Sequence, residues 1–312
     1  MIYLARSLAR LGHSVVVGAP GTPGIFDGAE YVHFQNDLNR LLQEQWDVLI
    51  MSRWVEALNN YPWNAQTILF WSHDLPAGPV SLKCHGSVFL TEFHSRHWQV
   101  PPDVGYIVGD GVDLSLFAGT EPIRNENVLL WTSNPDRGLA LAAKIFNEHL
   151  RPKWPDLELH VYGRSSVYGW PPENEGPFVP RREHEENVFL HEPLTKAGLA
   201  KALREAWAVF YPTYWPETYC IATLEAQAAG TPVIASPYGA LVETVEGGIL
   251  TYDFPNAVSQ LRNKNRWEKL SKLGQEHAST RDWDHRAEEW LKVIEKVRLQ
   301  HVPAPTAPTT TV

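Results

Sequence analysis

The chain has 312 residues, 44% hydrophobic residues and a formal net charge of −9 at neutral pH. This length allows two domains of ordinary size with substantial cores. The acidic balance argues against a general nucleic-acid-binding surface. Two cysteines, Cys84 and Cys220, indicate no disulfide framework and favour a reducing, cytoplasmic location. No apolar run reaches the length of a membrane span.

The amino-terminal segment has two interpretations. Residues 1–26 contain no acidic side chain, which a transit peptide would share. We favour an amphipathic helix over residues 2–11 that ends at Gly12 and is followed by a strand over residues 14–17.

Short apolar runs alternate with polar, helix-length segments or loops along the rest of the chain. Strands are predicted at residues 31–34, 48–51, 67–71, 87–90, 105–108, 128–131, 157–162, 208–212, 233–235 and from 247, and helices at residues 139–149, 196–207, 267–277 and 280–297. This alternation predicts an α/β fold with parallel sheets covered on both faces. Ligands bind beyond the carboxyl ends of such strands.

The organisation follows from these runs and from the polar connection at residues 119–126. We predict a first domain over residues 1–120, a second over 121–280, and a long helix over 281–301. Residues 165–186 are rich in Pro, Gly and charge and are expected to form a loop excursion. Residues 302–312 form a Pro/Thr tail that is expected to be disordered.

The most informative stretch is residues 216–235. A helix is predicted to begin near Thr218, its candidate N-cap, and to stop at Gly230 before a short strand. A helix start suits a diphosphate, because its first amides lack intrahelical partners. Glu217 lies just ahead of this helix and Glu225 lies on its second turn. Two such carboxylates could hold hydroxyls on either side of a phosphate, a pattern that a sugar nucleotide presents.

This stretch resembles the Glu-x7-Glu signature of the retaining glycosyltransferase family 4, including the Glu-Ala-x-Ala-Ala-Gly-x-Pro-Val-Ile run that begins at Glu225. The resemblance implies a GT-B architecture, with two Rossmann-like domains facing across a cleft and a final helix that crosses back to the first. It also implies transfer of a sugar from a nucleotide diphosphate donor, a UDP- or GDP-sugar, to a hydroxyl of a glycan or other acceptor, with retention of configuration.

The start of the chain departs from the family pattern. Leu-Ala-Arg-Ser-Leu-Ala-Arg-Leu-Gly-His-Ser-Val, from Leu4, resembles the family's first helix and second strand. Family members normally place a strand and a glycine-rich loop before that helix. We therefore expect either a naturally shortened enzyme or a sequence that is incomplete at its start.

The resemblance also implies roles for individual residues. Glu217 would contact the hydroxyls of the transferred sugar, and Glu225 those of the ribose. Arg137 would contact the donor phosphates largely alone, because the second basic residue common in the family is absent from residues 131–134. His73 would face the transferred sugar or the acceptor. The further donor-binding candidates are Thr218, Tyr219, Cys220, Ile221, Ser133, Gly163, Arg164, His191 and Pro193.

No metal ion or cofactor is expected, because this architecture neutralises the diphosphate without a metal. His94 and His97 could be taken for a metal pair, but they lack a convincing third ligand. Retention could involve Glu217 as a nucleophile, although front-face attack is the preferred inference.

Three other functions stay open at this point. One is a non-catalytic nucleotide-sugar or carbohydrate-binding protein, since the first strand and glycine loop are missing. Another is an enzyme that glycosylates nucleic-acid bases, which the acidic balance disfavours. A phosphorylase would need a lysine-bound pyridoxal phosphate, and no lysine lies in a suitable context.

Overall fold

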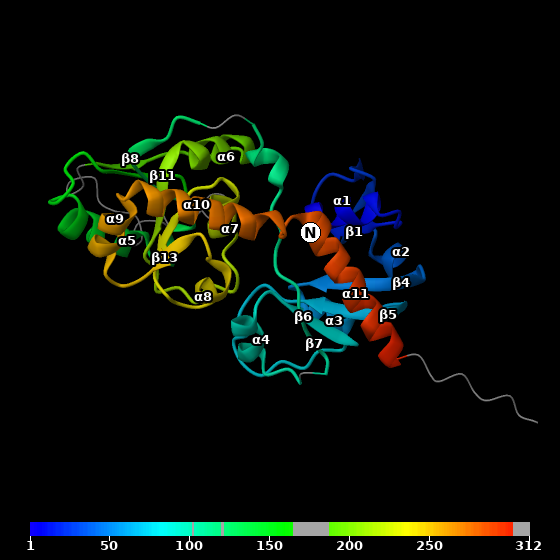
Figure 1. The fold of residues 1–312 in the computed structure, drawn as a ribbon. Coiled ribbons are helices and arrows are strands. Elements are labelled where there is room, and N and C mark those ends of the chain that lie inside the picture. The colour runs from blue at the N-terminus through cyan, green and yellow to red at the C-terminus, as the bar shows by residue number, and fades with distance from the viewer. Residues whose placement is uncertain (102, 120–121, 165–186, 302–312) are drawn as a thin grey trace, which may run out of the picture. The chain divides into compact units, whose positions relative to one another are not determined.

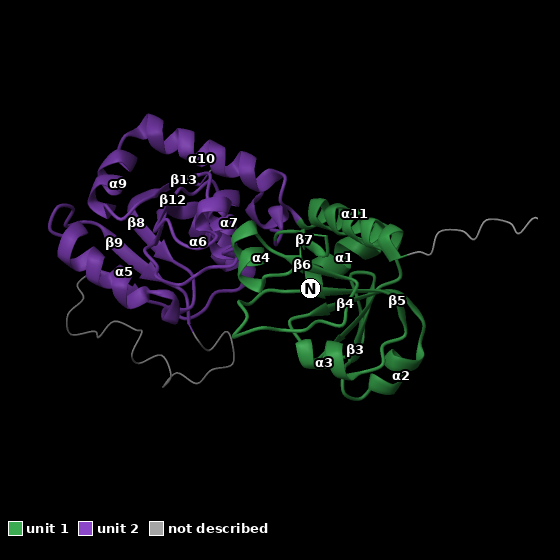
Figure 2. Ribbon diagram, turned by 90° about the horizontal axis from the view of Figure 1, so that it is seen from below, with its two compact units in different colours: residues 1–109, 283–312 green, residues 110–282 purple. Residues whose placement is uncertain are grey.

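The computed structural model describes residues 1–101, 103–119, 122–164 and 187–301. It divides the chain into two compact units (Figures 1 and 2): unit 1 comprises residues 1–109 and 283–312, and unit 2 comprises residues 110–282. The chain changes unit at Gly109, ahead of the polar connection at residues 119–126 that the sequence suggested. The expected excursion at 165–186 and the expected tail lie outside the described residues.

The described part of unit 1 contains two sheets, with strand orders β1-β3-β2 and β4-β5-β6-β7. Its strands are β1 (Val16–Ala19), β2 (Gly24–Phe26), β3 (Ala29–His33), β4 (Trp46–Ser52), β5 (Ala65–Trp71), β6 (Gly86–Phe89) and β7 (Gly105–Ile107). Its helices are α1 (Ile2–Arg10), α2 (Leu38–Gln43), α3 (Val55–Asn60), α4 (Glu92–Trp98) and α11 (Trp283–His301). The second sheet is parallel throughout.

The predicted first helix is present as α1, but the strand after it begins at Val16 rather than at residue 14. The sequence analysis also missed β2, which pairs antiparallel with β3 across Asp27 and Gly28. Both turn residues have positive φ, 51° and 83°, as a two-residue hairpin turn requires. Asp-Gly was the available signal for this hairpin.

Helix α11 belongs to unit 1 and supplies part of its core. Trp290 is fully buried and meets Trp71 at the end of β5 edge to face, with ring centroids 5.1 Å apart. At the start of α11, Trp283 stacks on Tyr3 of α1. The apolar stripe predicted on this helix therefore fastens α1 and β5 into one unit although they are far apart in sequence.

In its described residues, unit 2 is built on one six-stranded parallel sheet with the order β10-β9-β8-β11-β12-β13. Its strands are β8 (Asn125–Trp131), β9 (Glu158–Val161), β10 (Val188–Leu190), β11 (Ala206–Tyr211), β12 (Val233–Ala235) and β13 (Gly248–Leu250). Its α-helices are α5 (Leu139–Ile145), α6 (Lys196–Glu205), α7 (Ile221–Ala228), α8 (Leu241–Thr244), α9 (Phe254–Leu261) and α10 (Lys264–Ser279). Shorter helical segments are η1 (Leu114–Phe117), η2 (Pro135–Arg137) and the π-helix η3 (Phe146–Leu150).

This strand order indicates where a sheet of this kind would bind a ligand. The chain adds strands outward from β8 in one direction, through β9 and β10, and then returns to add β11, β12 and β13 on the other side. That is the order of a doubly wound, Rossmann-like sheet, whose order reverses between β8 and β11. Connections on opposite faces separate at that point and leave a crevice beyond the carboxyl ends of the two strands. The predicted α/β class with parallel sheets is confirmed.

The approach of α10 to the sheet gives a prediction. A Cβ atom on Gly247, just before β13, would lie 2.4 Å from the Cα atom of Gly274 in α10. Backbone therefore packs on backbone, and Gly247→Ala must push α10 outward. We expect a loss of about 1–3 kcal/mol in the free energy of unfolding, measured by urea denaturation. Gly78→Ala is the matched control, since a Cβ there meets nothing within 4 Å. Equal stability of the two variants would contradict this packing.

Candidate functional site

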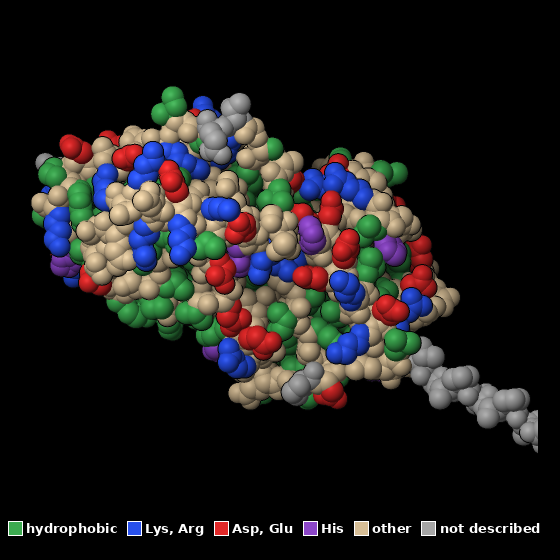
Figure 3. Space-filling view, viewed as in Figure 1, with side chains coloured by type: hydrophobic (Ala, Val, Ile, Leu, Met, Phe, Trp, Pro, Cys, Tyr) green, Lys and Arg blue, Asp and Glu red, His purple; other side chains and the backbone are tan. Residues whose placement is uncertain are grey.

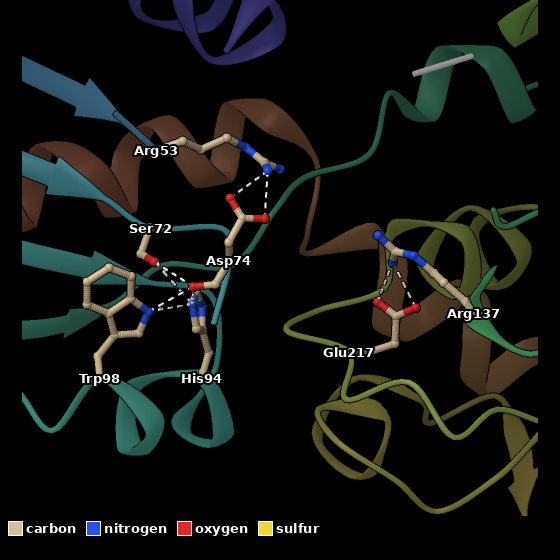
Figure 4. A network of polar contacts seen from close by, with 7 residues as sticks. All are labelled: Arg53, Ser72, Asp74, His94, Trp98, Arg137 and Glu217. Carbon is tan, nitrogen blue, oxygen red and sulfur yellow. Dashed lines mark hydrogen bonds and ion pairs between the residues drawn. The ribbon is translucent and has the colours of Figure 1, made fainter. Parts of the chain in front are cut away.

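An ion pair between a half-buried arginine and a buried carboxylate occupies the point where the sheet of unit 2 reverses its strand order. Arg137 ends the segment η2 after β8, and Glu217 lies in the loop after β11. Nη1 of Arg137 donates to both carboxylate oxygens of Glu217, at 2.9 and 2.7 Å (Figure 4). The hydroxyl of Tyr211, the last residue of β11, donates to the same carboxylate. The loops after β8 and β11 are distant in sequence, and the Glu217 carboxylate thus joins them through hydrogen bonds.

The backbone around Glu217 is fixed as firmly as its side chain. The amide of Ala240 donates to the carbonyl oxygen of Glu217 at 2.8 Å. Gly239 has φ +63°, and a Cβ there would lie 2.7 Å from the nitrogen of Glu217. The loop after β12 therefore packs directly on the backbone of the loop after β11. Gly239 has a conformation there that only glycine adopts at low cost.

The electrostatics explain why this arrangement needs all three side chains. Glu217 is only 2% exposed, and a buried carboxylate requires a charged or hydrogen-bonding partner. Burial raises the pKa of Tyr211 well above its ordinary value, and the negative charge of Glu217 raises it further. The phenol therefore stays protonated and keeps donating. Arg137 also lies over the ring of Trp215, 5.6 Å from its centroid.

The start of α7 differs from the prediction. The helix begins at Ile221, after Cys220 in a left-handed conformation with φ 75°, so Thr218 is not its N-cap. A non-glycine residue at positive φ persists only where its surroundings hold it. Thr223 Oγ1 donates to the carbonyl oxygen of Cys220, and Thr244 Oγ1 donates to that of Tyr219. The first-turn amides of α7 are thus presented two residues later than Thr218 would have placed them.

Burial raises the pKa of the Cys220 thiol, so this side chain is uncharged at neutral pH. Cys220 therefore contributes its backbone conformation to the start of α7 and does not act as a reactive thiolate.

Glu225 lies on the second turn of α7, as predicted, and it is buried and has a partner that the sequence analysis missed. Lys196 Nζ lies 2.5 Å from Oε1 of Glu225. Lys196 is the first residue of α6, and Thr195 caps that helix by accepting from the amide of Gly198. The sequence signal was a lysine at the first position of a helix that follows a strand end, where side chains reach the ligand edge of a parallel sheet.

The other donor-side candidates follow neighbouring strands. A Cβ on Gly163, after β9, would lie 1.6 Å from the carbonyl oxygen of Ser133, after β8, so the two loops touch through their backbones. Arg164 lies 3.8 Å from the carboxylate of Glu192 in the loop after β10. Pro193 is exposed in that same loop.

His191, directly after β10, lies in an aromatic stack. Its ring stacks on that of Tyr162, with centroids 4.5 Å apart. Its Nε2 atom lies 2.9 Å from Nδ1 of His160. Burial, and then the neighbouring His160, lower the pKa of His191, so the ring is neutral at neutral pH and presents an uncharged edge.

His73 lies in unit 1, in the loop after β5. It is half-buried, with its ring centroid 4.5 Å from that of Trp71. Burial, and then the positive charge of Arg53, lower the pKa of His73 well below its ordinary value. The ring is therefore a neutral donor and acceptor at physiological pH.

A hydrogen-bonded cluster fixes the loop that carries His73 (Figure 4). Arg53 Nη1 donates to both oxygens of the Asp74 carboxylate at 2.8 Å. The Asp74 carbonyl oxygen accepts from Trp98 Nε1 at 2.9 Å and lies 3.0 Å from His94 Nε2. The sequence analysis did not predict a role for Arg53. This residue directly follows β4 and has a φ of 64°, a conformation that a non-glycine residue keeps only where its surroundings hold it.

His94 has a structural role. The amide of Leu90 donates to its Nδ1 atom at 3.2 Å, so the proton of the neutral ring sits on Nε2 and points to Asp74. The Nδ1 atom of His97 lies 2.8 Å from the carbonyl oxygen of Phe93. Among the described residues there is no group of three or more His, Cys, Asp or Glu side chains that could hold a metal ion. Both cysteines are free.

None of the helices within residues 1–101, 103–119, 122–164 and 187–301 has both the length and the apolar character that crossing a bilayer requires.

Part of the chain is similar in sequence to known glycosyltransferases. Residues 126–264 match the family model described as Glycosyl transferases group 1. Similar curated proteins include the D-inositol 3-phosphate glycosyltransferases of Segniliparus rotundus, 26% identical over 62% of this chain and 47% of that protein, and of Kribbella flavida, 28% identical over 59% and 49%. The chain spans about half the length of these relatives.

Solved structures extend the likeness to nearly the whole chain. A glycosyltransferase from Rickettsia africae ESF-5 matches with a TM-score of 0.73 at 12% identity, over 96% of this chain and 94% of that one. Sucrose-phosphate synthase from Thermosynechococcus elongatus matches with 0.70 at 16%, over 95% and 92%. AviGT4, a glycosyltransferase involved in avilamycin A biosynthesis, matches with 0.69 at 18%, over 96% and 88%. The chain has the GT-B fold of two Rossmann-like domains, as the resemblance implied.

The buried His94 predicts a pH dependence of stability. Burial lowers its pKa from 6.5 to about 4 in the folded protein. Between these values the unfolded chain binds the proton and the folded chain does not, so the free energy of unfolding falls as the pH falls from 6.5 to 4. The loss amounts to about 3 kcal/mol, and above pH 6.5 the contribution is constant.

Urea unfolding of the wild type and of His94→Gln at pH 7 and pH 4 tests this. The difference in unfolding free energy between the two proteins removes the effect of other titrating groups. We expect the advantage of the wild type to shrink on acidification. An advantage that is the same at both pH values would show that His94 does not titrate in this window.

Proposed function

We propose that the protein transfers a hexosyl residue from a nucleoside diphosphate sugar to an acceptor hydroxyl, with retention and without a metal ion. The observation that carries this proposal is the buried Glu217 carboxylate, held by Arg137 and Tyr211 at the reversal point of the sheet, with α7 starting four residues later. The match to group 1 glycosyltransferases at residues 126–264 spans these elements and supports it.

Glu217 would accept hydrogen bonds from hydroxyls of the transferred sugar. Its carboxylate already accepts from Arg137 and Tyr211, which draw on its lone pairs and favour positioning over nucleophilic attack. Front-face displacement would then account for retention. In that step the acceptor oxygen attacks from the side of the leaving diphosphate, and a leaving oxygen takes the acceptor proton.

Arg137 and the first amides of α7 would stabilise the negative charge that develops on the leaving diphosphate. A helix start and a guanidinium are groups that bind phosphate without reorganising during the reaction. Glu225 would accept hydrogen bonds from the ribose hydroxyls, and the contact with Lys196 orients that buried carboxylate. The segment with His191 and Pro193 would contact the nucleobase of a UDP- or GDP-sugar. We also propose that His73 contacts the transferred sugar or the acceptor.

The rival functions gain no specific support. On the face drawn in Figure 3, lysine and arginine side chains are interspersed with acidic ones, whereas a nucleic-acid-modifying enzyme would need a continuous basic path. A non-catalytic sugar-nucleotide-binding protein would bind donor without turning it over, which the first experiment below measures.

Glu217→Gln keeps the size of the side chain and removes its charge. We expect at least a tenfold loss of activity in a screen of UDP-, GDP- and ADP-sugars for slow acceptor-free hydrolysis in the presence of EDTA. Glu268→Gln, in an exposed pair with Lys264 on α10, is the matched control. Circular dichroism checks that the variant is folded. Turnover at the wild-type rate by a folded Glu217→Gln protein would rule out the assigned role.

Arg137→Ala should weaken binding of a nucleoside diphosphate far more than binding of the nucleoside. A charge-assisted hydrogen bond contributes about 1.5–3 kcal/mol, so we expect roughly a tenfold or greater loss of diphosphate affinity in calorimetry. Arg137→Lys keeps the charge and loses the fork of donors, so its diphosphate affinity should lie between those of the wild type and Arg137→Ala. Equal losses for nucleoside and diphosphate would contradict the phosphate role.

A further inference from the structure

Exposed aromatic side chains gather at the edge of unit 2 that carries Glu217. Tyr214 and Trp215 follow β11, Tyr238 follows β12 and Tyr252 follows β13, and all four are exposed. These strands are parallel neighbours, so the loops after them lie at one edge of the sheet. A single exposed aromatic residue is ordinary, whereas several at the ligand edge of a sheet indicate a binding surface.

The backbone fixes Trp215 relative to both residues of the ion pair. The amide of Glu217 donates to the carbonyl oxygen of Trp215 at 2.9 Å. The amide of Trp215 donates to Oγ1 of Thr213 at 2.9 Å, and that hydroxyl donates to the carbonyl oxygen of Arg137. The guanidinium of Arg137 lies over the indole ring. Trp215 is therefore held in place although it is 40% exposed, which indicates that it presents its ring to a ligand.

The groups around Trp215 complement the two sides of a sugar ring. A pyranose has a face of C–H groups and a rim of hydroxyls. The face of an indole ring carries negative charge density and attracts the weakly positive C–H groups. The phenol hydroxyls of Tyr214 and Tyr238, in the same loop and in the next one, can donate to or accept from the hydroxyls of the rim. A linear alcohol has hydroxyls but no such C–H face.

The geometry of the reaction selects the acceptor as the occupant. Under the function proposed above, Arg137 contacts the leaving diphosphate, and the acceptor oxygen attacks from the side of that diphosphate. Trp215 packs against Arg137 and therefore lies on the same side. The transferred sugar has its own partner in the Glu217 carboxylate. The ring of Trp215 is thus placed for the molecule that approaches beside the diphosphate.

We propose that Trp215 binds the acceptor and that the acceptor is itself a carbohydrate, whose ring stacks on the indole while Tyr214 and Tyr238 contact its hydroxyls. This inference rests on the proposed function, and it narrows the acceptor from hydroxyl compounds in general to those that carry a sugar ring beside the reacting hydroxyl.

The test is a titration of the full chain, labelled with 5-fluorotryptophan, by fluorine NMR. The Trp215 signal is the one that disappears in Trp215→Phe. The probes are the methyl glycosides of glucose, mannose and galactose, each added with whichever of UDP, GDP and ADP binds most tightly, and glycerol is the control without a ring. We expect the Trp215 signal to shift saturably with at least one glycoside and not with glycerol.

Trp267 supplies a matched internal control. It also lies under an arginine, with Cζ of Arg124 5.0 Å from its ring centroid, but Arg124 directly precedes β8 and so lies at the opposite edge of the sheet. Its signal, assigned with Trp267→Phe, should stay unchanged throughout the titration.

Two variants separate stacking from support of Arg137. Trp215→Leu keeps an apolar side chain and removes the flat ring, so it should weaken glycoside binding about three- to tenfold in ligand-observed NMR. Trp215→Tyr keeps an aromatic face and should lie closer to the wild type. Calorimetry of Trp215→Leu should show a smaller loss of nucleoside diphosphate affinity than of glycoside affinity.

Three results would overturn the proposal. One is a Trp215 signal that no glycoside shifts, or that glycerol shifts equally. Another is a shift with an intact nucleoside diphosphate sugar but with no free glycoside, which would assign the ring to the transferred sugar. The third is an equal loss of glycoside and diphosphate affinity in Trp215→Leu, which would show that the ring acts only through Arg137. These titrations need no turnover, so a failure of the proposed function, seen as absent donor hydrolysis, is distinguished from a failure of this inference.

Discussion

The carboxylate of Glu217 is the constraint around which unit 2 is arranged. An ionised group with 2% exposure is tolerable only with charged or hydrogen-bonding partners. Its partners come from two different loops: Arg137 follows β8, and Tyr211 ends β11. These strands are neighbours because the sheet reverses its order there. The strand order of the sheet therefore brings together the buried Glu217 carboxylate and the two residues, Arg137 and Tyr211, that stabilise it.

Backbone geometry extends this rigidity to the neighbouring loops. Gly239 packs against the main chain of Glu217, and Gly163 packs against that of Ser133, at distances that no side chain at either glycine would allow. Cys220 holds a left-handed conformation that sets the first amides of α7. Sites held through main-chain contacts are preorganised, and preorganised donors are effective in stabilising charge that develops during a reaction.

Unit 1 combines tight aromatic packing with an apolar cavity. Trp290 and Trp71 bury the junction between α11 and β5, and Trp283 fastens α11 to α1. Between these well-packed parts, β1 and β4 both border a cavity lined by apolar side chains.

The sequence by itself determined the elements of regular, strongly patterned runs: α1, the strand at Val233–Ala235, and the helix α11 with its tryptophan stripe. It also singled out Glu217, Glu225 and Arg137, because short motifs record chemistry locally. Only the tertiary structure decided that Arg137 pairs with Glu217, that Lys196 reaches Glu225, and that α7 starts at Ile221 instead of Thr218. Those outcomes depend on contacts between loops far apart in the chain and on one residue at positive φ, which local propensity does not encode.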